Sequence, residues 1–151
     1  MSDRYRRKQR LDSLFKKSDT FSDGELMGHW ARYLCVQTYG YLEKCFVEIV
    51  EDYCRKASCP RTFSYVSSRL KRLNNIGPSE IEDLLSIFDN QWREKYDKIF
   101  VGSKEREHAA SILSNRNKIS HGEDSGIRLS TITTYRTSIE SILDELEKIV
   151  K

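Results

Sequence analysis

Two residues in the last third of the sequence, Arg116 and His121, have side chains suited to chemistry on a phosphodiester. Cleavage of RNA without a metal needs a base for the 2′-hydroxyl proton and positive charge beside the phosphate oxygens. An imidazole ordinarily titrates near pH 6.5 and can act as base or acid, whereas a guanidinium stays charged and matches phosphate oxygens. His121 is therefore suited to act as general acid or base, and Arg116 is suited to bind the scissile phosphate.

Helix geometry separates this pair. At about 100° per residue, Arg116 and His121 lie about 140° apart around a helix axis, whereas Asn117 shares the face of His121 and can hold its imidazole in one tautomer. Three arrangements would bring Arg116 to the site. The long side chain can reach in, the helix can unwind at Gly122, or two protomers can pack their motif helices together.

Three further residues are candidates for supporting roles. Glu43 lies on a helix row with Val36 and Tyr39, so its carboxylate is expected to turn toward the core and pair with Arg116. The alternative leaves Glu43 at the solvent boundary. Ser120 and Lys118 adjoin the motif and are possible RNA contacts, although a serine at a helix end is commonly just solvated.

The elements that carry these residues are predicted to be helices. A short amphipathic helix spans residues 4–17, and Ser22–Glu25 forms a capping box that starts a long helix ending near Ala57. Gly28 and Gly40 interrupt this helix, and such glycines usually allow a bend or a close approach of another helix.

Apolar residues at three- and four-residue spacing continue through the rest of the chain. The expected helices are 63–73, 79–99 with a capping box at Ser79–Glu82, 104–120 with Gly122 in the left-handed position after it, and a last helix capped by Ser130. With no strand-period segment, the pattern predicts an all-α, antiparallel up-and-down bundle of about five to six helices.

Charge is concentrated at the N-terminus. Residues 1–20 contain seven Lys or Arg and three Asp, a net charge of +4, whereas the whole chain carries +3. We therefore divide the chain into a basic amphipathic helix or arm at 1–18 and a bundle at 19–151. The arm is compatible with a phosphate-bearing partner, or is simply a solvated face. No stretch is long and apolar enough for a signal or a membrane span, so we expect a cytoplasmic protein with no membrane partner.

The four cysteines and three histidines have no metal-ligand spacing. Cys35, Cys45 and Cys54 lie in the long apolar helix and are expected to pack as small hydrophobes. We expect no metal site and no cofactor.

The segment Arg116-Asn117-Lys118-Ile119-Ser120-His121 resembles the R-x4-6-H signature of the HEPN superfamily. Segments 28–34 (GHWARYL), 108–113 (HAASIL) and His121-Gly122 followed by Gly126-Ile127 are similar to the RiboL-PSP-HEPN branch, over about residues 20–150. The resemblance implies a HEPN-like bundle and a homodimer with a composite site. It also implies a metal-independent endoribonuclease acting by 2′-hydroxyl attack on RNA, as a toxin or antiviral-defence effector.

Two other functions are compatible with the same residues. One is a non-catalytic HEPN module that binds RNA or a partner protein, such as an antitoxin, in a defence or toxin–antitoxin system. The other is a structural dimerisation domain, in which Arg116 and His121 would matter only for stability.

Overall fold

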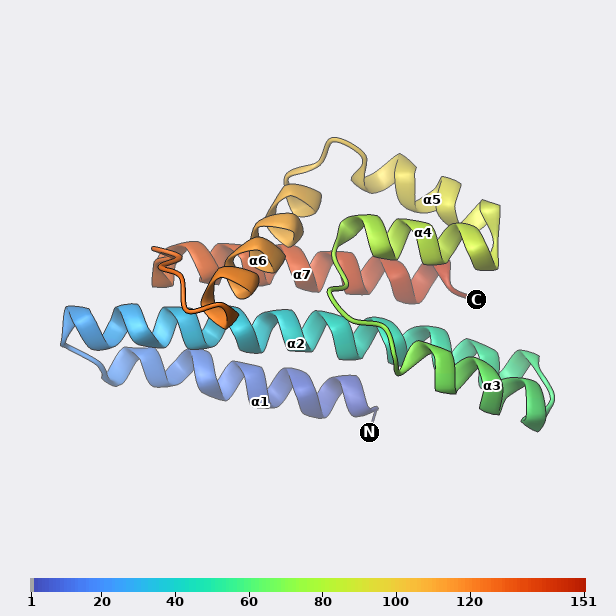
Figure 1. The fold of residues 1–151 in the computed structure, drawn as a ribbon, viewed down its shortest axis with the longest axis horizontal. Helices are drawn as coiled ribbons and strands as arrows, with labels where there is room; N and C mark the ends of the chain where they lie inside the picture. Colours follow the sequence, from blue (N-terminus) through green and yellow to red (C-terminus); the bar gives the residue numbers. More distant parts are fainter. Residues whose placement is uncertain (1) are drawn as a thin grey trace.

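The computed structural model describes residues 2–151, and within this range the chain forms seven α-helices, one short 3-10 helix and no strand (Figure 1). The elements are α1 (Asp3–Lys17), η1 (Ser18–Thr20), α2 (Gly24–Ala57), α3 (Pro60–Leu70), α4 (Pro78–Phe88), α5 (Asn90–Phe100), α6 (Lys104–Ser120) and α7 (Leu129–Ile149). The all-α prediction is confirmed, with seven helices instead of five or six. No helix in the described range has the length and apolarity to cross a membrane.

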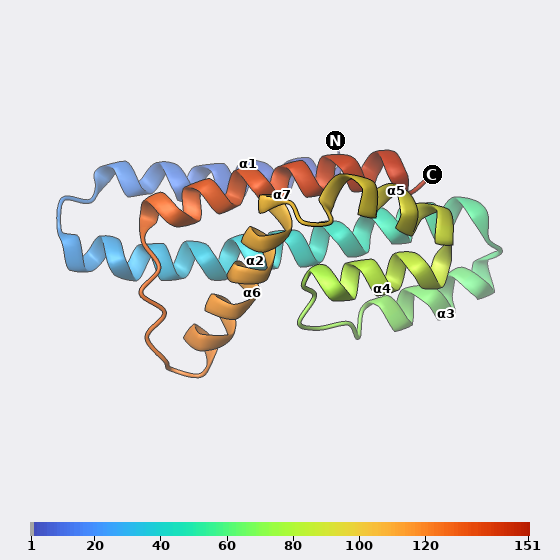
Figure 2. The same cartoon turned by 90° about the horizontal axis from the view of Figure 1, so that it is seen from above.

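The long helix α2 is the central helix of the fold. It packs against α7 along one side and against α1, α3 and α6 on others. The two long helices α2 and α7 run in the same direction, because α6 lies across both before the chain returns into α7 (Figures 1 and 2). One continuous core joins these helices. It includes Leu34, Phe46, Ile112 and Ile139, which are all fully buried.

The basic helix α1 is docked on this core by Leu11 and Phe15. Several of its cations meet carboxylates of the same chain. Arg4 lies 3.3 Å from Glu140, 2.6 Å from Asp144 and 2.8 Å from Glu147, all on α7. Much of the positive charge of the N-terminal segment is therefore neutralised within the fold.

The prediction of a single helix over 79–99 was wrong, because the helix is interrupted at Asp89. This residue has an extended backbone (φ −162°, ψ 119°) and its carboxylate accepts the Gln91 N–H at 2.7 Å, so it ends α4 and caps α5. The break folds α5 back beside α4. It also brings the Trp92 ring to 4.7 Å from the Tyr53 ring of α2 and 6.0 Å from the Phe88 ring.

Both predicted capping boxes were misplaced, as were two other helix starts. Asp23, not Ser22, caps α2 by accepting the Leu26 N–H at 2.9 Å. Helix α4 begins after Gly77, whose N–H donates to Glu80 at 2.8 Å, and this leaves Glu82 free for other contacts. Helix α7 begins at Leu129 with no side-chain cap from Ser130, and α3 occupies 60–70 instead of 63–73.

Candidate active site

The motif lies at the end of α6 that projects from the bundle. Figure 2 shows this helix diverging from α2 and α7, with the loop that follows it at the far end. Ala109 and Ile112 are buried near its middle, whereas Lys118, Ser120 and His121 are exposed. Gly122 has φ +72°, as predicted for the left-handed residue after a helix. The motif is therefore presented on a rigid element to solvent or to another molecule.

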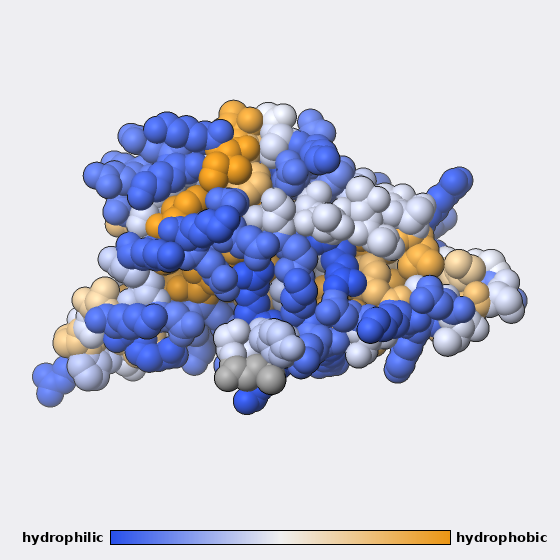
Figure 3. Space-filling view, turned by 180° about the vertical axis from the view of Figure 1, so that it is seen from behind, coloured by the Kyte–Doolittle hydropathy of each residue, from blue (hydrophilic) through white to orange (hydrophobic). Residues whose placement is uncertain are grey.

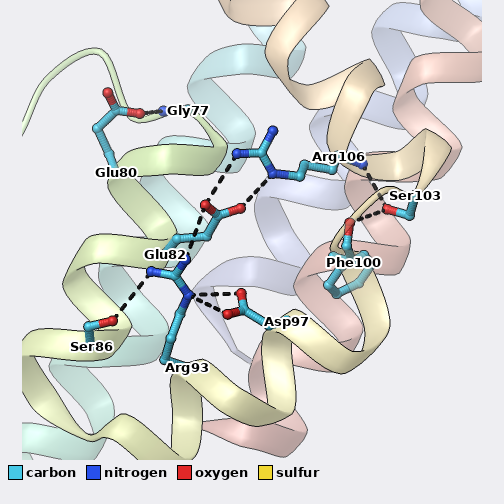
Figure 4. Close-up of polar contacts among 9 residues, drawn as sticks. All are labelled: Gly77, Glu80, Glu82, Ser86, Arg93, Asp97, Phe100, Ser103 and Arg106. Atoms are coloured by element: carbon cyan, nitrogen blue, oxygen red, sulfur yellow. Dashed lines mark hydrogen bonds and ion pairs between the residues drawn. The ribbon is translucent and has the colours of Figure 1, made fainter.

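The N-terminal end of α6 is fixed by charged side chains from α4 and α5 (Figure 4). Arg106 donates to both carboxylate oxygens of Glu82, at 2.6 and 3.2 Å, and Arg93 lies 3.7 Å from the same carboxylate. Arg93 also donates to both oxygens of Asp97 at 2.8 Å. The Arg106–Glu82 pair is bidentate and therefore directional, so it holds the start of α6 at one angle to the hairpin of α4 and α5.

The Arg116 guanidinium is held at three points. Its Nη1 donates to the Asn75 Oδ1 at 3.2 Å and to the Asn117 Oδ1 at 3.0 Å, and its central carbon lies 4.8 Å from the centre of the Tyr39 ring. A guanidinium over an aromatic face is attracted by the negative face of the ring. Both Nη1 protons are thus used, while no described residue accepts from Nε or Nη2.

Tyr39 links this arginine to the core. Its hydroxyl donates to the Glu43 Oε2 at 2.7 Å and accepts the Ile76 N–H at 2.8 Å, and the side chain is only 3% exposed. Burial raises the pKa of Tyr39, and the hydrogen bond to Glu43 raises it further. The phenol therefore stays neutral and rigidly joins α2 to the loop between α3 and α4.

That loop approaches α6 closely, and two of its residues make this possible. Asn75 adopts a left-handed backbone (φ +53°), which asparagine tolerates better than most residues. A Cβ added at Gly77 would lie 2.6 Å from the Leu113 Cδ2 of α6, so a glycine there allows the contact. The loop can therefore bring the Asn75 amide to Arg116.

The structure thus gathers some predicted residues and separates others. Glu43 is half-buried, but no ion pair joins it to Arg116 in the described range, and it reaches the arginine only through Tyr39. The Asn117 amide oxygen is bound by Arg116, and no described side chain hydrogen-bonds the His121 ring. Ser120 donates to the Arg116 carbonyl at 2.9 Å, which closes the last turn of the helix.

The sequence did not indicate Asn75 as a partner of Arg116, and it placed Tyr39 only on the helix row of Glu43. The run Asn74-Asn75-Ile76-Gly77-Pro78 is a recognisable turn, but nothing in it indicates contact with α6. His108 lies elsewhere on α6, where its Nδ1 contacts the Ser138 Oγ at 2.7 Å and its ring lies 4.5 Å from that of Tyr135.

Among residues 2–151, no group of three His, Cys, Asp or Glu side chains is arranged to hold a metal ion. Cys35, Cys45 and Cys54 are buried, as predicted for small core residues, whereas Cys59 is exposed.

Comparison with known proteins gives one match over nearly the whole chain. Residues 2–151 match the sequence profile of the family described as RiboL-PSP-HEPN, and this range includes α1 as well as the motif helix. No curated protein and no solved structure matches the chain.

Proposed function

Because this chain belongs to the RiboL-PSP-HEPN family, whose HEPN domain indicates a nuclease- or RNA-related function in general, we propose that it is an endoribonuclease. In this proposal Arg116 binds the scissile phosphate and His121 transfers protons, without a metal ion. The biological setting that we propose is a toxin or antiviral-defence system, in which a partner protein such as an antitoxin controls the activity.

The observation that supports the proposal is which nitrogens of the Arg116 guanidinium are hydrogen-bonded within the protein. Its Nη1 donates to Asn75 and Asn117, and its central carbon lies over the Tyr39 ring. The Nε and Nη2 edge has no acceptor among the described residues. This edge offers two parallel donors, the geometry in which arginine binds two oxygens of one phosphate. A surface arginine with only a structural role does not need several contacts that fix its guanidinium and leave one edge without an acceptor.

The proposed reaction is an in-line transfer within RNA. A base removes the 2′-hydroxyl proton, the 2′ oxygen bonds to phosphorus, and the bond from phosphorus to the 5′ oxygen breaks. The leaving 5′ oxygen takes a proton from an acid, and the products are a 2′,3′-cyclic phosphate and a 5′-hydroxyl. Arg116 would stabilise the negative charge on the non-bridging oxygens during this step.

Two proton-transfer groups are required, which favours a homodimer. One protomer has a single motif histidine, His121, which lies about 140° around the axis from Arg116 and is exposed at the projecting end of α6. Packing two such ends together would place two histidines and two arginines around one phosphate, with one imidazole as base and the other as acid.

The decisive experiment incubates purified protein with a labelled RNA pool in EDTA. Wild type is expected to give fragments ending in 2′,3′-cyclic phosphate, and His121→Ala and Arg116→Ala are expected to give none. His29→Ala is the control, because His29 is also exposed but lies on α2. Replacing the 2′-hydroxyl by hydrogen at the cut position should abolish cleavage.

Two results would count against the proposal. If wild type and His121→Ala both fail to cleave, and wild-type expression is not toxic, the enzyme assignment should be dropped in favour of an RNA- or protein-binding module. A sedimentation measurement that finds only monomer at micromolar concentration would remove the composite site, whereas a dimer that Arg116→Glu dissociates would support it.

A further inference from the structure

A second cationic site lies between α1 and α2. The two helices leave a hollow of about 330 Å³, and Arg7, Arg10 and Lys44 stand around it. No Asp or Glu of the described residues lines the hollow. Arg7 is held by Glu48, at 2.6 Å from Nη2, whereas Arg10 and Lys44 have no ion pair with any residue in the range 2–151.

These cations differ from the paired cations of α1, and the unpaired Lys16 and Lys17 of the same helix do not line the hollow. Arg4 and Lys8 meet carboxylates of α7, and Arg6 meets Asp3. Arg10 forms no ion pair with the described residues, and Lys44 lines the same hollow from α2. Two unpaired cations beside a third that is fixed in place form a concentrated positive field, which attracts phosphate.

Gly40, near the middle of α2, also lines the hollow. A Cβ added there would have no heavy atom within 4 Å, so packing does not require a glycine at this position. The sequence had suggested that such a glycine allows either a bend or the close approach of another helix, and the open space around Gly40 shows no close approach. A glycine also lets a ligand come close to the backbone, and this is the role that the open position fits.

The hollow lies beside the candidate active site. Gly40 follows Tyr39, on which Arg116 rests, so the two positions are about 100° apart around α2. On a helix 10–12 Å across this is an arc of about 10 Å. Figure 2 shows the end of α6 on one side of α2 and α1 on the other. The partly exposed surface of α2 that includes Val36 and Glu43 lies between Arg116 and the three cations.

We propose that the hollow between α1 and α2 binds the phosphate backbone of the RNA strand whose scissile phosphate Arg116 holds. The strand would leave the end of α6, cross α2 at Gly40 and place a flanking phosphate between Arg10 and Lys44, with Arg7 beside it. This inference rests on the proposed function for the identity of the ligand, and it assigns α1 to substrate binding.

The test measures binding of a labelled single-stranded RNA of mixed sequence to the full chain carrying His121→Ala, which prevents cutting. Adding Arg10→Ala and Lys44→Ala should weaken binding about tenfold or more. It should also reduce the slope of log affinity against log salt by about 1.4, for two lost phosphate contacts. Lys16→Ala with Lys17→Ala is the matched control, because these exposed lysines lie on α1 and do not line the hollow.

A second variant tests the hollow without removing charge. Gly40→Leu places a side chain in open space, so the thermal midpoint should hold or rise while RNA affinity falls. Equal affinity and equal salt slope for the hollow and control variants, or full affinity with Gly40→Leu, would overturn the inference.

The two proposals can fail separately. If wild type does not cut RNA but the hollow variants lose binding that the control retains, the nuclease assignment fails and the hollow stands. If wild type cuts and the hollow variants bind normally, the inference fails alone.

Discussion

The central carbon of the Arg116 guanidinium lies over the Tyr39 ring, 4.8 Å from the ring centre. This contact joins the motif helix α6 to the central helix α2, because Tyr39 is a buried residue of α2 that also hydrogen-bonds Glu43 and Ile76. The arginine is thus positioned by residues 41 and 77 positions earlier in the chain, and its Nε and Nη2 have no acceptor among the described residues.

Removing the Tyr39 hydroxyl should destabilise the protein. In Tyr39→Phe the buried Ile76 N–H loses its acceptor and Glu43 loses its donor, which predicts a loss of about 1–3 kcal/mol in the free energy of unfolding. Urea denaturation measures this loss. Tyr65→Phe is the control, because Tyr65 is 62% exposed and should lose almost nothing. Equal stability of the two variants would contradict the linking role of Tyr39.

Asn75→Gly should separate activity from stability. Glycine adopts the left-handed backbone at φ +53° without strain, so the fold is expected to hold, but the acceptor for Arg116 disappears. A hydrogen bond to a charged group contributes about 1.5–3 kcal/mol, so RNA cleavage should fall at least tenfold. The measurement pairs single-turnover cleavage with thermal melting. Unchanged cleavage would show that Asn75 does not position the arginine.

Glu82→Ala should cost more stability than the loss of a surface charge. Glu82 is 7% exposed and holds Arg106 and Arg93, so its removal leaves two partly buried arginines without this partner. We expect a loss of about 3 kcal/mol. Asp52→Ala breaks the exposed pair with Arg55 and should cost under about 1 kcal/mol. Similar losses in both variants, measured by urea denaturation, would argue against a structural role for the Glu82 cluster.

The cysteines should differ sharply in reactivity. Burial raises the pKa of Cys35 to about 11 and that of Cys45 to about 12, whereas the hydrogen bond with Thr62 lowers the pKa of Cys59. Because the thiolate is the nucleophile, a lower pKa means faster alkylation near neutral pH. Iodoacetamide should therefore label Cys59 first in the native protein, as peptide mass mapping will show.

Thr62→Val provides the control for that assignment. It removes the side-chain hydrogen bond to Cys59, so the rise of labelling rate with pH should move to higher pH. Labelling of Cys35 or Cys45 before Cys59 in the folded protein would contradict the burial of the α2 cysteines.

The sequence predicted the elements that have clear local signals. The long helix ends at Ala57 and the motif helix spans 104–120, as expected from the Cys59-Pro60 and Gly102-Ser103 breaks. The break at Asp89 was not predicted, because apolar spacing continues through it. The hairpin is favoured by contacts of Trp92 with a distant helix, and these are not visible in local spacing.

The candidate site was predictable only in part. Arg116, Asn117 and His121 stood out by residue type, and the row of Tyr39 and Glu43 was recognised. The contacts of Arg116 with Asn75 and Tyr39 depend on how α6 crosses α2, and therefore on packing between distant segments. Periodicity within one helix carries no information about that crossing.

The ion pairs between Arg4 and α7 have a consequence for synthesis. Asp144 follows Arg4 by 140 positions in the chain, and Glu147 lies just beyond it, so Arg4 leaves the ribosome long before either partner. The first helix cannot complete its docking until the last one has emerged, and α7 also supplies Ile139, Ile142 and Leu146 to the core. The native core of residues 2–151 therefore cannot form before α7 has been synthesised, which also delays assembly of the surface that we propose to bind RNA.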